Sequence, residues 1–215
     1  MVMCGDAAAL MSHQLDIFQR APGTDLVPGL RYLPELVTCE REARLLADVD
    51  ARPWLGDLKR RVQHYGYKYD YKARAISRSM FVGPLPAFAV ELATTLIAAG
   101  LLIEHPDQLI VNEYVPGQGI SPHVDCEPCF KERIVTVSLG SRCEMDFLAQ
   151  EGTRITKTLM LEPRSALLIS GVARYDWMHT IRARLSDRGQ KRTRRVSLTF
   201  RNVILAYSDA PQQPR

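Results

Sequence analysis

A His-x-Asp pair and a later histidine have the residue types and the order of a metal site. His123 and Asp125 follow a strand-like apolar segment and a Gly/Pro turn. Residues two apart in a strand share a face, so both side chains can point at one ion. His179 stands 56 residues further on and would reach the ion from a separate strand. Two imidazoles and a carboxylate leave one side of the ion open, which is typical of non-haem Fe(II) sites, although zinc accepts the same ligands.

A second pattern suits an anion beside that metal. The segment 195–201 alternates polar and apolar residues, which places Arg195, Ser197, Thr199 and Arg201 on one strand face. Charge directed into a sheet interior is costly unless it is paired, so a bound anion is a natural partner. The two arginine Cα atoms would lie roughly 20 Å apart, and side chains that lean inward would narrow the gap to the span of a small dicarboxylic acid such as 2-oxoglutarate. The alternative is that the arginines face solvent at a sheet edge.

The composition predicts one basic domain. With 215 residues and 46% hydrophobic content, the chain can bury one good core and is short for two. Arginine supplies 22 of the 28 basic residues, the net charge is +4 and the pI is about 8.9. This balance favours a polyanionic partner such as nucleic acid, although an ordinary mildly basic enzyme has the same charge.

The cysteines and the apolar segments indicate the compartment. Five cysteines are an odd number without the spacing of a disulfide scaffold, which fits a reducing cytosol. Neither a signal sequence nor an apolar run long enough to span a bilayer is evident. We therefore expect a cytoplasmic protein with no membrane partner. Cys126-x-x-Cys129 has no second ligand pair, so we interpret it as structural or incidental thiols.

Helix signals precede strand signals along the chain. A helix is predicted after Thr38, and its expected apolar stripe comprises Ala43, Leu46, Ala47 and Val49. Pro86 opens a second helix, which stops at Gly100. Short β-rich runs follow at 108–115, 134–139, 143–148, 155–161, 165–170, 177–181 and 195–205. Helices followed by many strands predict an α+β fold with an all-β core, either a sandwich or a barrel.

Five motifs in this order resemble those of the AlkB family of Fe(II)- and 2-oxoglutarate-dependent dioxygenases. The matching residues are Asn112-x-Tyr114-x-Pro116-Gly117, His123-x-Asp125, Ser138-Leu139-Gly140, Arg174-Tyr175-x-Trp177-x-His179 and Arg195-x-Ser197-x-Thr199-Phe200-Arg201. The resemblance covers about 108–205 well and the preceding stretch more loosely. His-x-Asp alone is weak evidence, whereas the ordered set is specific.

The resemblance implies a double-stranded β-helix, or jelly roll, with N-terminal helices and a nucleotide-recognition lid. His123, Asp125 and His179 are then the Fe(II) ligands. The residues expected around 2-oxoglutarate are Asn112, Tyr114, Arg195, Ser197 and Arg201, and O2 takes the open iron position. Arg195 is expected on the far carboxylate and Arg201 near the end that chelates iron. The chain would comprise a tail over 1–22, helices and lid over 23–107, the dioxygenase core over 108–207 and a tail over 208–215.

A tyrosine-rich segment before the core suits a nucleotide lid. Tyrosines at alternate positions from 65 to 71 offer rings for base stacking, and nearby arginines and lysines offer cations for phosphates. The expected substrate contacts are Tyr67, Tyr69, Tyr71, Arg74 and Glu127, where Glu127 stands at a position that is acidic in several repair members of the family. The alternative is a β-ribbon that packs its tyrosines on the core.

The family resemblance leaves the substrate open. Removal of N-alkyl groups from DNA or RNA bases, with release of formaldehyde, is the first expectation. The run 60–69, with Arg174-Tyr175-x-Trp177 and Ser197, resembles the branch that hydroxylates a modified wobble uridine in tRNA, which is the second. Protein demethylation or hydroxylation is a third, and a non-catalytic jelly-roll binding module is an alternative from another class. A monomer is expected, as is usual in the family.

Overall fold

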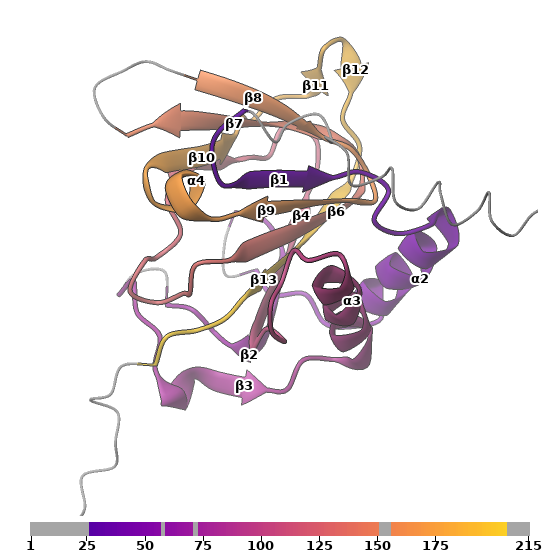
Figure 1. Cartoon of the computed structure of the whole chain (residues 1–215). Coiled ribbons are helices and arrows are strands. Elements are labelled where there is room, and N and C mark those ends of the chain that lie inside the picture. Colours follow the sequence, from indigo (N-terminus) through magenta and orange to yellow (C-terminus); the bar gives the residue numbers. More distant parts are fainter. Residues whose placement is uncertain (1–25, 57–58, 71–72, 151–155, 206–215) are drawn as a thin grey trace, which may run out of the picture.

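The computed structural model describes residues 26–56, 59–70, 73–150 and 156–205, which fold into two β-sheets packed face to face (Figure 1). The larger sheet has the order β1 (Leu30–Leu33), β9 (Ser165–Ile169), β6 (Ile134–Gly140), β13 (Arg195–Arg201), β4 (Gln108–Tyr114), β2 (Val62–Tyr67) and β3 (Phe81–Gly83). The smaller sheet has the order β5 (Ile120–His123), β10 (Trp177–Ile181), β7 (Cys143–Ala149) and β8 (Thr156–Leu161). This antiparallel jelly roll confirms the predicted α+β fold class.

Two helices cover the outer face of the larger sheet (Figure 1). The first, α2 (Cys39–Asp50), begins where the Thr38 hydroxyl accepts a hydrogen bond from the Arg41 amide, which satisfies one free amide of the first turn. Its buried face differs from the predicted stripe. Leu45 and Val49 are buried, whereas Ala43 and Ala47 are exposed. The larger Leu side chain therefore determines which face packs on the sheet, because it buries more apolar surface than alanine does.

The second helix, α3 (Ala87–Ala98), has the predicted ends. Pro86 caps its start, and Gly100 follows its end with a φ of 67°. Glycine adopts this left-handed conformation without strain, which is why it commonly ends helices. A five-residue helix, α4 (Gly171–Tyr175), and a 3-10 turn, η1 (Arg78–Met80), lie in the connections. No helix in the described part of the chain is long and apolar enough to cross a membrane.

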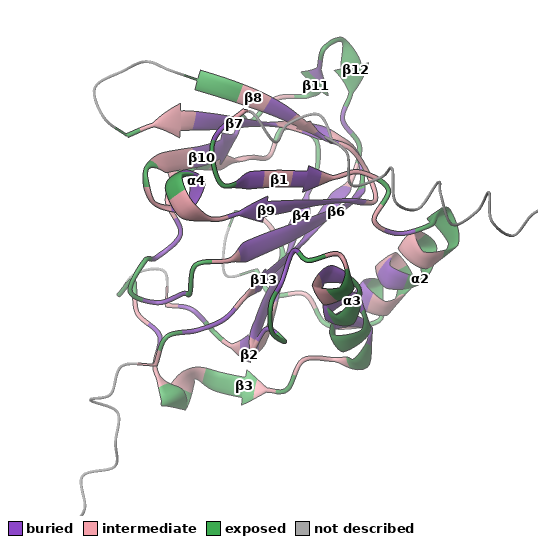
Figure 2. Cartoon of the chain, in the orientation of Figure 1, coloured by how far each residue is buried: buried purple, intermediate pink, exposed green. Residues whose placement is uncertain are grey.

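The central strand β13 separates the apolar core from a polar interior. Val196, Leu198 and Phe200 are fully buried in the cluster that joins the larger sheet to α2 and α3. Arg195 and Ser197, on the opposite face, are also buried, and this face looks toward the smaller sheet. Figure 2 shows the same burial along β4, β6 and β13. The predicted alternation of this strand is therefore confirmed, and it directs arginines into the space between the sheets.

Several strands were missed in the sequence. The strands β1, β2 and β3 precede residue 108 and join the larger sheet, so strand structure begins earlier than the predicted order of helices and then strands. They have only three to six residues, and Gly66 weakens the strand signal of β2. Pro122 does the same in β5, which is tolerated because β5 lies at the edge of its sheet. The predicted strand 195–205 ends earlier, at Arg201.

A buried ion-pair cluster fixes the chain just before β13. The hairpin of β11 (Ser186–Asp187) and β12 (Gln190–Lys191) buries the Asp187 carboxylate. This carboxylate accepts from Arg184 Nε at 2.7 Å and from Arg192 Nε at 2.6 Å. Burial alone would raise the pKa of Asp187, but the hydrogen bonds from Arg192 and Arg184 lower it below its ordinary value. The ionised carboxylate therefore stabilises the turn that leads into Arg195.

Asp187→Asn should destabilise the protein by about 3 kcal/mol at pH 7, because it leaves the buried Arg192 guanidinium without its counter-charge. Since the folded-state pKa is depressed, this contribution is present above the unfolded-state pKa of about 4 and is lost as the pH falls through the folded-state value. Urea unfolding of both proteins between pH 7 and pH 3 measures the difference. Glu104→Gln, which removes an exposed partner of Lys131, should cost under about 0.5 kcal/mol. A pH-independent difference for Asp187→Asn would contradict the prediction.

Candidate functional site

The smaller sheet brings His123 and His179 opposite each other. They are paired residues of the antiparallel strands β5 and β10, and their ring centroids lie 4.3 Å apart. Asp125 lies two residues beyond the end of β5, and not within the strand as predicted, and its Oδ2 lies 3.7 Å from His179 Nε2. One ligand atom from each of the three residues lies within 4.8 Å of the other two. The structure thus brings the predicted triad together in a geometry that can hold one metal ion.

The protonation states of the triad suit a cation. Burial, followed by repulsion from His123, lowers the pKa of His179 to about 4, so its imidazole is neutral at pH 7. His123 Nδ1 lies 2.8 Å from the Ser121 carbonyl oxygen, and a proton on that nitrogen leaves Nε2 free to bind metal. Burial would raise the pKa of Asp125, but Arg201 and the two imidazoles hold it well below its ordinary value. The neutral His179 imidazole, His123 Nε2 and the ionised Asp125 carboxylate therefore face one point.

Two arginines support the Asp125 segment from different sides. Arg201 Nη2 donates to Asp125 Oδ1 at 2.5 Å, which leaves Oδ2 on the side of the histidines. Arg174 is almost fully buried in α4, and it donates to the carbonyl oxygens of Asp125 at 2.8 Å and Cys126 at 3.2 Å. Because α4 directly precedes β10, the same guanidinium connects the Asp125 loop to the strand that carries His179.

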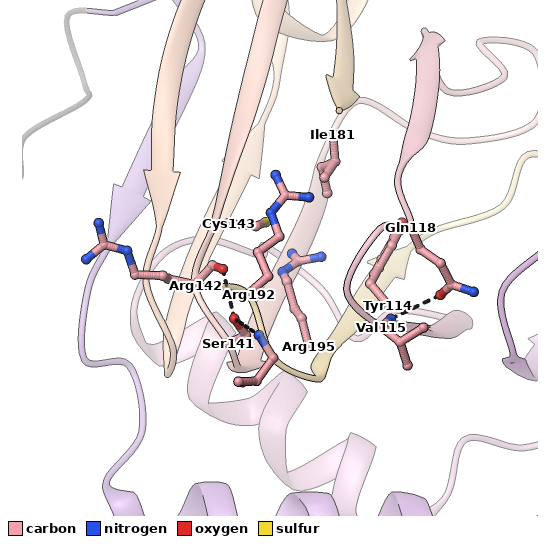
Figure 3. Close-up of a pocket in the computed structure, with 10 residues that line it drawn as sticks. Tyr114, Val115, Gln118, Ser141, Arg142, Cys143, Ile181, Arg192 and Arg195 are labelled. Atoms are coloured by element: carbon pink, nitrogen blue, oxygen red, sulfur yellow. Dashed lines mark hydrogen bonds between the residues drawn. The ribbon is translucent and has the colours of Figure 1, made fainter. Parts of the chain in front are cut away.

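A pocket between the sheets lies around Arg195, with Tyr114, Cys143 and Ile181 among its lining residues (Figure 3). Arg195 Nη2 donates to the Ser138 hydroxyl at 2.8 Å. Its Nε and Nη1 atoms are buried without a hydrogen-bond partner in the described parts of the chain. Buried guanidinium N–H groups that lack a hydrogen-bond acceptor are energetically costly, so this pocket fits an anionic group.

The other arginines of the pocket are already paired. Arg192 binds Asp187, and Arg142 Nη1 lies 3.6 Å from Glu162. Arg195 is therefore the one pocket arginine for which the described residues provide no carboxylate. An acid that entered here would neutralise a buried charge that the protein itself leaves uncompensated.

The residues predicted around the co-substrate form one cross-strand patch. In the pairing of β13 with β4, Arg195 lies opposite Tyr114 and Ser197 lies opposite Asn112. The Arg195 guanidinium carbon lies 5.4 Å from the Tyr114 ring centroid. Arg201 lies opposite Gln108 and donates to its side-chain oxygen at 3.2 Å. The structure thus places the predicted co-substrate residues on one face, with Arg201 at the metal end.

The predicted substrate residues lie in and beside the segment 67–74. The Tyr69 ring packs 5.5 Å from Phe130, over which the Arg201 guanidinium also lies, so Tyr69 borders the metal site. Tyr67 contacts Phe81 of β3, with ring centroids 5.3 Å apart. Arg74 and Glu127 are exposed. Tyr71 falls outside the described residues.

Part of the tyrosine segment packs on the core, as the alternative interpretation predicts. Tyr65 packs edge-on against Phe88 of α3, with ring centroids 6.3 Å apart, and its hydroxyl donates to Gln63. It is therefore a core residue of the larger sheet. A shift in the β2–β3 pairing between Gly66 and Tyr67 changes the direction of the chain after this point. Beyond it, Tyr67 packs against Phe81 and Tyr69 packs against Phe130.

The interpretation of Cys126 and Cys129 as structural or incidental thiols was wrong about their oxidation state. The two residues form a disulfide across a turn, with their Cα atoms 5.3 Å apart. The turn is closed by the amide of Phe130, which donates to the Cys126 carbonyl at 3.2 Å. Both sulfur atoms lie 3.4 Å from the carbonyl oxygen of Arg74. The segment after Asp125 therefore contacts the segment 67–74 directly.

Sequence reasoning did not foresee the contacts of two further residues near the site. Arg174 was noted only as part of a motif, because nothing in a sequence shows that an arginine will be buried against backbone carbonyls. Arg60 lies just before β2, and its Nε donates to the Asn112 side-chain oxygen at 2.8 Å. The sequence indicated Arg60 only as one of several cations beside the tyrosines, and it did not identify Asn112 as its partner.

Comparisons with known proteins agree with this geometry. The sequence pattern described as the 2OG-Fe(II) oxygenase superfamily matches residues 35–201. The Alkylated DNA repair protein ALKBH8 homolog of Arabidopsis thaliana is 38% identical over 82% of the chain, which spans 59% of that protein. The tRNA (carboxymethyluridine(34)-5-O)-methyltransferase alkbh8 of Xenopus tropicalis is 36% identical over 83% of the chain, which spans 32% of it. The chain therefore corresponds to only part of each of these relatives.

The solved structure of OsALKBH1 has a similar fold. It covers 81% of this chain and 97% of its own, with a TM-score of 0.65. Because the sequence identity is 18%, this likeness shows the shared fold alone.

Arg174→Met should lower the affinity for a divalent metal by about 10- to 100-fold, as is usual when a group that orients a metal ligand is lost. Titration calorimetry with Mn²⁺ measures this, and Arg174→Lys, which keeps one donor, should lose less. Arg133→Met is the matched control, because Arg133 also donates to two backbone carbonyls, those of Gly100 and Leu101, elsewhere in the fold. Equal metal affinity in the wild type and a folded Arg174→Met variant would contradict the prediction.

Proposed function

The chain belongs to the 2OG-Fe(II) oxygenase superfamily, and we propose that it is an AlkB-type dioxygenase that uses Fe(II), 2-oxoglutarate and O2 to oxidise a modified base of a nucleic acid. The observation that carries the proposal is that Tyr69 packs on Phe130, whose ring also lies under Arg201, the hydrogen-bond partner of Asp125. When bound, iron and 2-oxoglutarate supply the oxidising power that places one oxygen atom of O2 on a substrate carbon, with succinate and carbon dioxide as co-products.

The proposed roles follow the contacts. His123, Asp125 and His179 hold Fe(II), since their ligand atoms meet at one point. Arg195 binds the far carboxylate of 2-oxoglutarate through its unpartnered N–H groups, because a bidentate guanidinium matches a carboxylate in geometry and charge. Arg201 keeps Asp125 ionised and oriented, and its own position places positive charge near the chelating end of the co-substrate.

Asn112, Tyr114 and Ser197 complete the proposed co-substrate cradle. All three are buried and lie on the face of β4 and β13 that carries Arg195. Asn112 and Ser197 are directly paired, so an amide and a hydroxyl stand side by side in a largely water-free space. Such fixed donors replace the water that a free dianion would hold.

The surroundings of the triad support a flat aromatic substrate. Tyr69 packs on the buried Phe130 ring, which lies under Arg201, and Tyr67 packs on Phe81, which is half exposed. Arg74 is an exposed cation on the same segment. Stacking of bases on aromatic rings, with cations for the phosphates, is how proteins commonly bind single-stranded or extruded nucleotides. We propose that Tyr67, Tyr69, Tyr71, Arg74 and Glu127 contact the substrate.

Two reactions fit this site. Hydroxylation of an N-alkyl carbon gives an unstable product that releases formaldehyde, which is the first candidate and agrees with the alkylated DNA repair name of the Arabidopsis relative. The second candidate is stable hydroxylation of a modified uridine in tRNA. It is supported by the names of the Xenopus and mouse relatives, which concern a carboxymethyluridine at tRNA position 34.

His123→Ala and Arg195→Met should each lower turnover of 2-oxoglutarate to succinate at least 100-fold, because one loses a metal ligand and the other the partner of a buried carboxylate. Succinate is quantified with Fe(II), ascorbate and O2 present. His105→Ala, which replaces an exposed imidazole away from the triad, is the control. Full turnover in either site variant would overturn the assigned role of that residue.

The substrate class is tested by incubating the enzyme with methylated DNA, methylated RNA and tRNA, followed by nucleoside mass spectrometry and a formaldehyde assay. Formaldehyde release identifies dealkylation, and a nucleoside 16 mass units heavier identifies stable hydroxylation, since one oxygen atom is gained. A product from none of the three would contradict a nucleic-acid substrate.

Arg74→Gln should weaken binding of the nucleic acid that the enzyme oxidises. It should also reduce the slope of log affinity against log salt concentration by about one, the value for one lost phosphate contact. Fluorescence anisotropy between 50 and 200 mM salt, roughly the range where such contacts respond, measures this. Arg44→Gln on α2 removes an equally exposed charge and should have no effect. Identical salt slopes for the wild type and Arg74→Gln would exclude Arg74 from the interface.

A further inference from the structure

Arg60 contacts two residues of the proposed co-substrate cradle. Its Nε donates to Asn112 Oδ1 at 2.8 Å, and its guanidinium carbon lies 5.2 Å from the centroid of the Tyr114 ring. The Arg195 guanidinium lies over the same ring at 5.4 Å. A half-buried arginine that meets both an amide and an aromatic ring of a ligand cradle restricts the side-chain conformations of both.

The neighbouring arginine points the other way. Arg61 Nε donates to Glu113 Oε2 at 2.6 Å, and its guanidinium lies over the Trp54 ring. Arg60 therefore contacts Asn112 on one face of β4, and Arg61 contacts Glu113 on the other face. Arg61 closes an ion pair on the outer face, whereas Arg60 reaches the face that carries Arg195.

A further contact holds this segment over the pocket. Gln118, which lines the Arg195 pocket, donates from Nε2 to the carbonyl oxygen of Lys59 at 3.1 Å. Its Oε1 accepts from the Val115 amide at 3.0 Å. The backbone before Arg60 is thus attached to the β4–β5 turn, so Arg60 approaches Asn112 from a fixed position.

The contact decides which end of the Asn112 amide faces the cradle. A carboxamide carries an acceptor oxygen and a donor nitrogen, and exchange of the two is opposed only by its hydrogen bonds. Because Arg60 is a cation, it binds the oxygen, and the Nδ2 hydrogens remain to donate elsewhere. The reversed amide would turn a partially negative oxygen toward an anionic ligand, which is unfavourable.

We propose that Arg60 is a positioning residue for 2-oxoglutarate: it fixes the Asn112 carboxamide with its donor end toward the co-substrate and holds the Tyr114 ring beside Arg195. This inference rests on the proposed function, since it takes the cradle as the 2-oxoglutarate site. Arg60 acts through Asn112 and Tyr114, and the roles of the metal ligands are unaffected.

The test is calorimetric titration of 2-oxoglutarate into the Mn²⁺-loaded protein, which reports binding without turnover. Arg60→Met should weaken binding by about tenfold, the usual effect of losing one hydrogen bond to a charged group. Arg61→Met removes the same charge on the other face and should change the affinity less than about twofold. In succinate assays, KM for 2-oxoglutarate should rise by more than kcat falls.

A double-mutant cycle separates positioning from a general loss of charge. If Arg60 acts through Asn112, then Arg60→Met combined with Asn112→Ala should bind 2-oxoglutarate no more weakly than Asn112→Ala alone, apart from a residual effect through Tyr114 of about twofold or less. Fully additive losses would overturn the proposed route through Asn112. Unchanged binding in Arg60→Met, with normal binding by the wild type, would overturn the role of Arg60 alone. No binding by the wild type would overturn the co-substrate site itself and this inference with it.

Discussion

The antiparallel pairing of β5 with β10 is the constraint on which the site depends. It sets His123 directly opposite His179, and Asp125 follows within two residues. Converging histidines and a carboxylate are unfavourable to bury without a counter-charge, and Arg201 provides one to Asp125. Arg174 then fixes the backbone of the Asp125 loop. The protein thus maintains a preorganised ligand set with an ionised carboxylate in the polar space between the two sheets.

The interior charges are organised by their partners. Arg201 pairs with Asp125 and Arg192 pairs with Asp187. Among the described residues, the Arg195 side chain donates a hydrogen bond only to the Ser138 hydroxyl. A buried guanidinium with unpartnered N–H groups is, among the described residues, the strongest indication of an anion-binding site. Arg60 lies beside Asn112, where its hydrogen bond can orient the Asn112 amide toward an anion bound at Arg195.

Much of this organisation could be predicted from the sequence, and the rest depends on three-dimensional packing. The alternation from Arg195 to Arg201 predicted both faces of β13, since strand periodicity is a local property. The stripe of α2 was misjudged because Leu45 competes with small alanines for the sheet, and this is decided by volume and not by period alone. Arg174, Arg60 and the Cys126–Cys129 disulfide depend on contacts between residues far apart in sequence, for which the chain carries no local signal. The different roles expected of Arg195 and Arg201 came from the family resemblance and not from strand periodicity.

The most direct test of the central claim is a crystal structure of the protein grown anaerobically with Mn²⁺ and 2-oxoglutarate. The account predicts one metal ion bound by His123 Nε2, Asp125 Oδ2 and His179 Nε2, with the co-substrate chelating it and its far carboxylate on Arg195. A metal ion bound elsewhere, or 2-oxoglutarate bound away from Arg195, would contradict the account.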